Sequence, residues 1–266
     1  MASSNPAFTN SPAFKAQAAV PAAISAQQLD ELYGRPAATP VETDRMTYED
    51  TIVKTVFSFA ILLAGAVVGW IFPVLALPAA LIGFVLALVN IFKKKPSKAL
   101  VLSYAAFEGV FVGGISAFFE TIYPGIAVQA VLATLTVVGV TLALFTSGKI
   151  RASKKATKIF LIAMIGYAVF SLINLGMMFF GATDQPFGMR SWEIPGLGIP
   201  LGVVLGVLVI FMAAYSLVLD FDNIQRGVRN GAPRVFAWQA AFGIMVTVVW
   251  LYIEILRLIA ILRGSE

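Results

Sequence analysis

Four acidic residues lie in or beside long apolar stretches of this sequence, where a charged side chain is costly. Glu108 lies in the middle of one stretch, Asp220 and Asp222 follow the end of another, and Glu254 lies within Leu251-Tyr-Ile-Glu-Ile-Leu-Arg257. A central aspartate costs about 3 kcal/mol on insertion scales before a partner or water relieves it. Because intramembrane carboxylates are typical of ion paths and proton relays, these residues are the candidates for chemistry.

The residue inventory excludes most other chemistry. The 266 residues include no cysteine and no histidine, so disulfides, thiolate or imidazole metal sites and Ser-His-Asp or Cys-His nucleophile systems are excluded. An aspartyl intramembrane protease would need paired aspartates at catalytic depth, whereas Asp222 is predicted at a membrane edge and Glu254 is a glutamate. We therefore expect neither enzyme activity nor a bound cofactor.

Each acid also has a purely structural interpretation. Glu254 and Arg257 are three residues apart, and Asp222 and Arg226 are four apart. Either pair could be an ion pair within one helix. Asp220 is about 200° around the helix from Asp222, so at most one of them faces the bundle centre. The sequence leaves that choice open.

Glu108 has a different setting, because Gly109 and Gly113 follow it on the same helix. Small residues spaced four apart let two helix backbones approach closely, which predicts a packed interface at Glu108 rather than lipid. The pairs Gly65/Gly69 and Gly202/Gly206 have the same spacing and predict similar contacts.

The elements that position these acids are apolar segments of about 20 residues, the length needed to cross about 30 Å of hydrocarbon. The chain is 59% hydrophobic and 12% charged, which is too apolar for a soluble domain. We predict an all-α membrane protein with a seven-transmembrane helix bundle in residues 51–266. The expected spans are Thr51–Phe72, Val74–Phe92, Ala99–Phe119, Ile126–Ser147, Ile159–Gly181, Leu197–Leu219 and Phe236–Leu262.

Residues 1–50 differ in composition from the rest of the chain. They are rich in Ala, Pro and Ser and lack the periodic apolar residues that a folded core needs. We expect a flexible cytoplasmic N-terminal tail in front of the seven-helix domain.

The basic residues orient the bundle. All of the 19 Lys and Arg residues except Arg190, Arg257 and Arg263 fall on one side when the N-terminus is placed inside. By the positive-inside rule this predicts a cytoplasmic N-terminus and an outer C-terminus. The net charge of +5 is therefore interpreted as a topology signal and not as a nucleic-acid surface. The absence of cysteine and of an apparent retention or transit signal fits a bacterial plasma (inner) membrane.

Four segments of the chain resemble the transmembrane Bax-inhibitor family, specifically its bacterial branch related to YccA. These segments are Arg45–Thr55, Ala106–Ser116, Leu219–Gly227 and Trp250–Arg257. Their order and the count of seven helices match the family over nearly everything beyond the tail. The resemblance implies that the seventh helix is central and that the other six surround it.

The resemblance also implies a pair of carboxylates that share a proton and gate a calcium leak. Phe221-Asp222-Asn223 matches the family's motif at the end of the sixth helix, and Leu251-Tyr-Ile-Glu254 matches the motif in the seventh. Asp222 and Glu254 are therefore the expected pH-sensing carboxylates, although the second is Glu rather than Asp and the loop Arg226–Arg234 is longer than in better-studied relatives.

Other residues are candidates for supporting roles at this gate. Glu108 and Asp220 are candidates for additional pore or gate positions, and Arg226 and Arg257 for ion-pair partners. Lys93, Lys94 and Lys95 could also reach the cytoplasmic end of the bundle.

The leading functional hypothesis is a pH-sensitive cation leak that conducts Ca²⁺. Loss of a shared proton would leave two repelling charges and expose oxygen ligands suited to a hard cation. The expected partners are the lipid bilayer, Ca²⁺ or another cation, and a membrane protein. One alternative is a regulatory membrane protein that acts through partners in cell death or membrane proteolysis. Another is a proton-coupled secondary transporter, which the absence of an obvious inverted repeat weakens.

Overall fold

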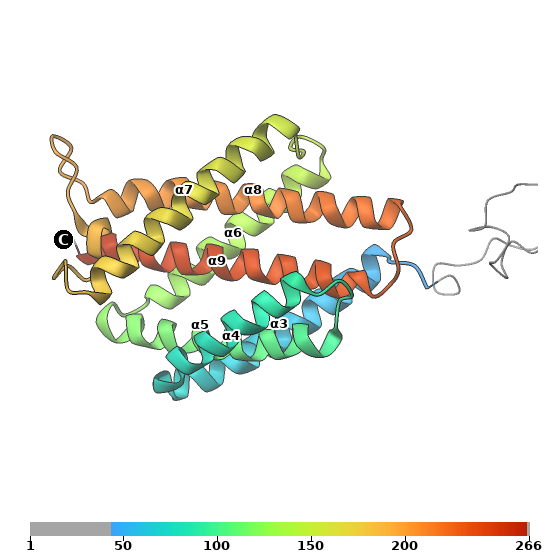
Figure 1. Ribbon diagram of the computed structural model, residues 1–266, viewed down its shortest axis with the longest axis horizontal. Helices are drawn as coiled ribbons and strands as arrows, with labels where there is room; N and C mark the ends of the chain where they lie inside the picture. Colours follow the sequence, from blue (N-terminus) through green and yellow to red (C-terminus); the bar gives the residue numbers. More distant parts are fainter. Residues whose placement is uncertain (1–43, 265–266) are drawn as a thin grey trace, which may run out of the picture. The chain divides into compact units, whose positions relative to one another are not determined.

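The computed structural model describes residues 44–264, and within them seven helices are long and apolar enough to cross a membrane (Figure 1). They are α3 (Tyr48–Ile71), α4 (Ala76–Phe92), α5 (Lys98–Ile122), α6 (Ile126–Thr146), α7 (Lys154–Phe179), α8 (Leu201–Arg229) and α9 (Phe236–Gly264). Short 3₁₀ turns, η1 (Pro73–Leu75) and η2 (Gly188–Ser191), lie in two of the connections. The predicted all-α, seven-helix fold class is confirmed. Residues 1–43 of the expected tail lie outside the described part of the chain.

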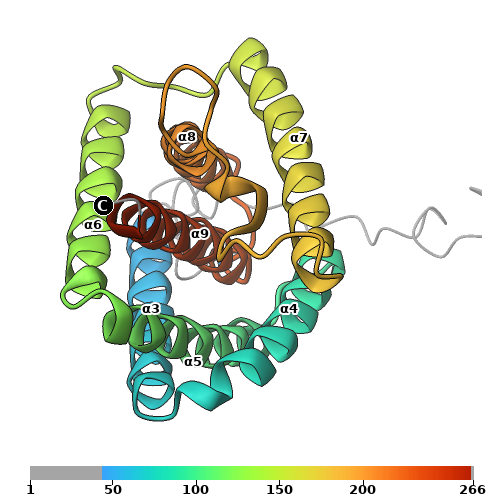
Figure 2. The same cartoon turned by 90° about the vertical axis from the view of Figure 1, so that its left-hand side faces the viewer.

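The central position of α9 is plain when the bundle is viewed along its length (Figure 2). It contacts α3, α5, α6 and α8, and its most apolar stretch is the most deeply buried of the seven spans described here. Ala237, Ala241 and Ala260 are fully buried along it, which allows the surrounding helices to approach its backbone closely. The central seventh helix is confirmed.

Glycines bring α3 and α5 into the most extensive helix contact of the described residues. A Cβ added at Gly109 would overlap the backbone of Leu62, and one added at Gly113 would overlap that of Ala66. Added Cβ atoms at Gly65 and Gly69 would likewise meet the α5 backbone. Both predicted glycine pairs therefore lie at a helix interface.

The third glycine pair lies where α8 meets α9. A Cβ added at Gly206 would lie 3.0 Å from the Leu258 side chain, and one added at Gly202 would lie 2.8 Å from the carbonyl oxygen of Arg190. This contact brings the loop between α7 and α8 close to both helices, and it positions part of the site described below.

The helix α7 packs more loosely than its neighbours. Most of its side chains are exposed, and within α7 only Asn174 is buried. Near its start, the Thr157 hydroxyl lies 3.0 Å from the Tyr215 hydroxyl of α8. Further along, the Tyr167 ring lies 6.3 Å from the Trp250 ring of α9. Polar and aromatic contacts, rather than a wide apolar face, therefore join α7 to the bundle.

Residues 44–50 are tied to the loop between α8 and α9, and we call this contact the clasp. The Met46 amide donates to the Ala232 carbonyl at 2.7 Å, and the Arg234 amide donates to the Asp44 carbonyl at 2.8 Å. The Asp50 carboxylate pairs with Arg234 at 2.9 Å and with Lys54 at 2.5 Å. Hydrogen bonding to Asp50 raises the pKa of the Arg234 guanidinium, so the clasp keeps its charge at any ordinary pH.

Candidate functional site

The carboxylate of Glu254 is buried at the centre of the bundle, with 3% of the residue exposed. Its Oε1 atom accepts a hydrogen bond from Arg257 of the same helix at 2.9 Å and another from the Tyr167 hydroxyl of α7. Its Oε2 atom lies 3.5 Å from Nη1 of Arg190 in η2 and accepts no hydrogen bond from the described residues. We call these four residues the Glu254 cluster.

Arg190 is as deeply buried as Glu254, with 4% of the residue exposed. Its Nη2 atom donates to the Tyr167 hydroxyl at 2.7 Å and to Ser171 Oγ at 3.4 Å. The guanidinium also lies 5.2 Å from the centre of the Tyr167 ring and 5.7 Å from that of Phe170. The charge is therefore shared among a carboxylate, two hydroxyls and two aromatic faces, as a buried arginine requires.

Asn174 of α7 determines where Arg190 lies. Its side-chain oxygen accepts from the Met189 amide at 2.7 Å, and its side-chain nitrogen donates to the Phe187 carbonyl at 3.3 Å. Between these residues, Gly188 has a φ of 59°, a left-handed conformation that side chains other than glycine rarely adopt. Asn174 thus fixes the turn η2 so that Arg190 enters the bundle.

The electrostatics of the Glu254 cluster are unequal. Two guanidiniums, Arg190 and Arg257, face one carboxylate, so the cluster carries a net formal charge of one positive unit. The ion pair of Glu254 with Arg257, one of the interpretations that the sequence left open, is present at 2.9 Å. Arg190 and Tyr167 were missed as site residues, because nothing in their spacing places them beside Glu254; the one available signal was a lone arginine within the apolar-flanked segment Phe187-Gly-Met-Arg190.

The structure does not bring Asp222 and Glu254 together, contrary to what the resemblance implied. Asp222 pairs with Arg226 at 3.0 Å, as its structural interpretation predicts. The antiparallel register of α8 and α9, set by contacts such as Gly206 with Leu258, places Glu254 level with about residue 210. Asp222 lies 12 residues further along α8, or about 18 Å. A proton cannot be shared over that separation.

Asp220 is the acid of α8 that faces the bundle centre. Its Oδ2 atom accepts a hydrogen bond from the Thr247 hydroxyl of α9 at 2.7 Å. The Thr247 hydroxyl in turn lies 3.3 Å from that of Ser216. Gly243 leaves room for the second carboxylate oxygen, which would lie 3.4 Å from an added Cβ. The choice that the sequence left open is therefore settled in favour of Asp220.

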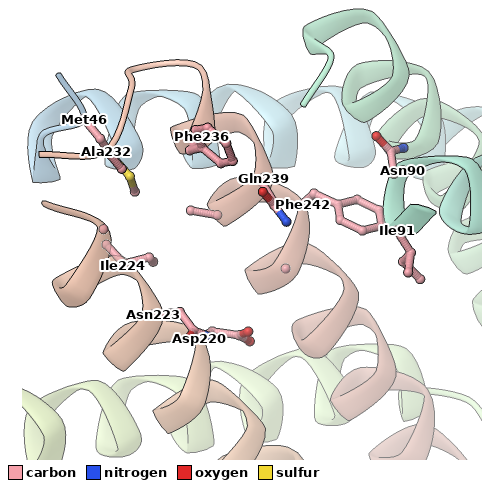
Figure 3. Close-up of a pocket in the computed structure, with 13 residues that line it drawn as sticks. Met46, Asn90, Ile91, Asp220, Asn223, Ile224, Ala232, Phe236, Gln239 and Phe242 are labelled. Atoms are coloured by element: carbon pink, nitrogen blue, oxygen red, sulfur yellow. The ribbon is translucent and has the colours of Figure 1, made fainter. Parts of the chain in front are cut away.

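A cavity of about 530 Å³ reaches Asp220 from the end of the bundle where the clasp lies (Figure 3). It lies between α8 and α9, with α4 and Met46 of the clasp contributing to its wall. Its polar lining residues are Asn90, Asp220, Asn223 and Gln239, and its larger apolar ones are Met46, Ile91, Ile224, Phe236 and Phe242.

Glu108 lies apart from both of these places, at the contact of α5 with α4. Its Oε2 atom would lie 3.0 Å from a Cβ added at Gly83, so the absence of a side chain at Gly83 makes room for it. The predicted helix interface at Glu108 is confirmed. Within residues 44–264 it makes no hydrogen bond or ion pair with Asp220 or Glu254.

Comparison with known protein families covers almost the whole sequence. Residues 5–264 match the family described as Bax inhibitor 1 like. The chain belongs to the Bax inhibitor 1-like family. Comparison with curated proteins finds no match. The family match includes all seven membrane helices, so the Glu254 cluster and the Asp220 cavity both lie within the family region of this Bax inhibitor 1-like protein.

Some of the basic residues expected to assist the gate pair with an acid in this Bax inhibitor 1-like protein, and others do not. Arg257 binds Glu254, and Arg226 binds Asp222. Lys93 borders a small space beside Asn90 and Gln239 without an ion pair to any acid in the described part of the chain. The intramembrane acids are therefore divided among separate places instead of forming one pair.

Proposed function

We propose that this Bax inhibitor 1-like protein is a pH-responsive cation leak that conducts Ca²⁺ along the contact between α8 and α9. The observation that supports this proposal is the succession of polar groups along the contact between α8 and α9. The cavity leads to Asp220, and the hydroxyls of Thr247 and Ser216 continue from it between the two helices in the direction of Glu254. The proposed activity is transport, with no catalysis and no bound cofactor.

A conducted cation would meet these oxygen atoms in succession. Among residues 44–264 no group of three acidic side chains could hold a metal ion. Ca²⁺ prefers six to eight oxygen ligands, so a site with a single carboxylate and a few hydroxyls binds it weakly. Weak binding at successive points suits conduction, because the ion must leave each point as readily as it arrives.

The Glu254 cluster supplies the barrier in this proposal. Its net positive charge repels a cation that has passed Asp220, and its burial makes that repulsion stronger than it would be in water. Protonation of Asp220 would remove the carboxylate that attracts the cation. This change occurs as pH falls, so we expect the leak to increase as pH rises.

The test is Ca²⁺ flux into proteoliposomes between about pH 5 and about pH 8. The natural protein should show flux that rises with pH. Asp220→Asn should lower the flux by about tenfold or more, because a unit charge about 4 Å from the ion contributes about 4 kcal/mol at an effective dielectric constant of about 20, and about 1.4 kcal/mol already corresponds to tenfold. Asp222→Asn is the matched control, since Asp222 pairs with Arg226 on a different side of the same helix. A natural protein without Ca²⁺ flux, or an Asp222 variant more affected than the Asp220 variant, would overturn the proposal.

A regulatory role through a partner is the second candidate, and the clasp favours it. The clasp ties residues 44–50 to the loop between the two helices that carry Asp220 and Glu254. A partner that displaces the clasp would therefore act on that loop. Deletion of residues 1–40 distinguishes the two candidates, because flux should survive the deletion while a partner-dependent activity should be lost.

A further inference from the structure

We propose that the cavity beside Asp220 binds a small organic cation, a protonated amine with an apolar body. The ammonium group would bind at Asp220, and the apolar body would lie along the wall made by Met46, Phe236 and Phe242 (Figure 3). This inference concerns binding and does not depend on whether the protein conducts ions.

The size of the cavity fits such a ligand. Sites for small molecules have volumes of about 300–1,000 Å³ and are mostly apolar with a few well-placed polar groups. The cavity has a volume of about 530 Å³, and its lining combines apolar side chains with a few polar ones. Met46 and Phe236 lie toward the clasp, while Asp220 and Asn223 lie deeper along α8 (Figure 3).

Among residues 44–264, three side-chain oxygens of the cavity are unused, as are the side-chain nitrogens of Gln239 and of Asn223, whose oxygen accepts from Arg226. Asp220 uses Oδ2 to bind Thr247, which leaves Oδ1 available. Asn90 donates its side-chain nitrogen to the carbonyls of Leu86 and Leu100, an arrangement that identifies its oxygen as the free atom. Within the described part of the chain, the Gln239 amide makes no hydrogen bond, so its oxygen is free as well. An ammonium group has three N–H donors and no acceptor, so it can bind at the unused oxygen of Asp220 and donate to neighbouring amide oxygens.

Among the described residues, Asp220 has no basic partner, although the unpaired Lys93 borders the adjacent small space that shares Asn90 and Gln239 with the cavity. Arg226 is paired with Asp222, and both Arg234 and Lys54 are paired with Asp50. Asp220 makes no ion pair with any residue from 44 to 264. Its charge is therefore available to a ligand.

The apolar wall argues for an organic cation over an inorganic one. A bare metal ion gains little from Phe236, Phe242 or Met46, and among residues 44–264 Asp220 is the one carboxylate that lines the cavity. Each buried CH₂ group of an amine, in contrast, strengthens binding about fourfold. Recognition should therefore need both the charge and the apolar body.

The experiment uses a cysteine placed in the cavity. Because the chain has no cysteine, Ala240→Cys provides a single thiol in the cavity lining, and Ala182→Cys provides an exposed thiol in the loop before η2 as the control. The rate of alkylation of each thiol is measured in detergent with increasing 2-phenylethylammonium or with its neutral counterpart 2-phenylethanol. Comparing two ligands on one protein requires no change at Asp220.

The expected result is that 2-phenylethylammonium slows alkylation at residue 240 but not at residue 182, and that 2-phenylethanol needs about tenfold higher concentration for the same protection. Adding Asp220→Asn should make the two ligands equivalent, while Asp222→Asn should preserve the difference. Equal protection by both ligands would reduce the cavity to an apolar pocket and overturn the proposal. So would no protection, or unchanged discrimination in the Asp220 variant. Because no ion gradient is present, a failure of Ca²⁺ flux leaves this result unaffected.

Discussion

Glu254 lies inside the bundle among neighbours that supply the hydrogen bonds and opposite charges that water would otherwise provide. Arg257 and the Tyr167 hydroxyl satisfy one carboxylate oxygen, and Arg190 faces the other. Removal of one member of a buried ion pair is costly, since the remaining charge loses its partner. The Glu254 cluster contains one arginine more than is needed to pair the carboxylate. Loss of either arginine therefore still leaves Glu254 paired.

This surplus leads to a prediction for Arg190→Gln. The substitution lowers the net charge of the Glu254 cluster from one positive unit to zero, and Arg257 remains as the partner of Glu254. In the proposed leak the barrier to cations should fall. Ca²⁺ flux in proteoliposomes should rise about tenfold, because one repelling unit charge is removed from the path. Arg263→Gln is the control, because Arg263 donates to the Pro124 carbonyl at an exposed position. Unchanged or lower flux in the Arg190 variant would exclude the cluster as the barrier.

Gly188 provides a second prediction at the scale of one residue. Alanine at this position would adopt a left-handed conformation and would also place its Cβ against the Asn174 side chain. We expect Gly188→Ala to lower the free energy of unfolding by about 1–2 kcal/mol from the backbone alone. Thermal unfolding in detergent measures the effect. Gly166→Ala on α7, where an added Cβ meets nothing within 4 Å, should unfold no earlier than the natural protein.

The spacing of residues predicted contacts within a helix better than contacts between helices. The pairs of Glu254 with Arg257 and of Asp222 with Arg226 follow from helical geometry alone. The contact of Glu254 with Arg190 joins residues 64 positions apart, and it depends on how Asn174 fixes the turn η2. No periodicity in the sequence encodes such a contact, so this part of the site could not be predicted.

At the scale of helices, the extent of α8 decides how far Asp220 lies from the end of the helix. The apolar run predicts an end at Leu219, whereas the helix continues to Arg229. The added turns carry charged residues that pair with one another, as Asp222 does with Arg226. This end of the helix can therefore lie in water. Asp220 consequently lies about 14 Å inside the end of the helix and not at its edge. A long apolar run predicts the presence of a membrane helix well. Its ends show where the chain leaves the hydrocarbon, and not where the helix ends.

The contact between α3 and α5 gives a prediction at the same scale. A side chain at Gly113 would overlap the backbone of Ala66, and neither helix backbone can yield without separating the pair. We expect Gly113→Val to destabilise the fold by more than the 1–3 kcal/mol typical of overpacking by a side chain. The measurement is the fraction of monodisperse protein after extraction and gel filtration. Gly139→Val on α6, where an added Cβ meets nothing within 4 Å, should leave that fraction unchanged.

For the whole molecule, the distribution of basic residues predicts its orientation. The loop between α4 and α5 has three basic residues, Lys93, Lys94 and Lys95. The loop between α7 and α8 has a single basic residue, Arg190. We expect the first loop to be cytoplasmic and the second to be outside. Because the chain has no cysteine, single substitutions can report this directly with a membrane-impermeant maleimide on intact cells.

In this measurement Thr183→Cys should react in intact cells, and Lys94→Cys should react only after the membrane is permeabilised. The reverse pattern would invert the topology and place the mouth of the Asp220 cavity outside. The cavity and the Glu254 cluster would keep their geometry in that case, but the direction of the proposed leak relative to the cell would change.

The central position of α9 also affects the order in which the bundle can assemble. The ribosome makes α9 after the six helices that surround it. Until α9 arrives, Ser116 of α5 lacks the Tyr252 hydroxyl, Asp220 lacks Thr247 and Arg190 lacks Glu254. Asp220, whose carboxylate makes no other hydrogen bond or ion pair within residues 44–264, therefore stays unpaired until α9 is in place. Assembly of the bundle ends when α9 packs among the helices made before it, and the loosely packed α7 is the helix that can move aside with the least loss of contact.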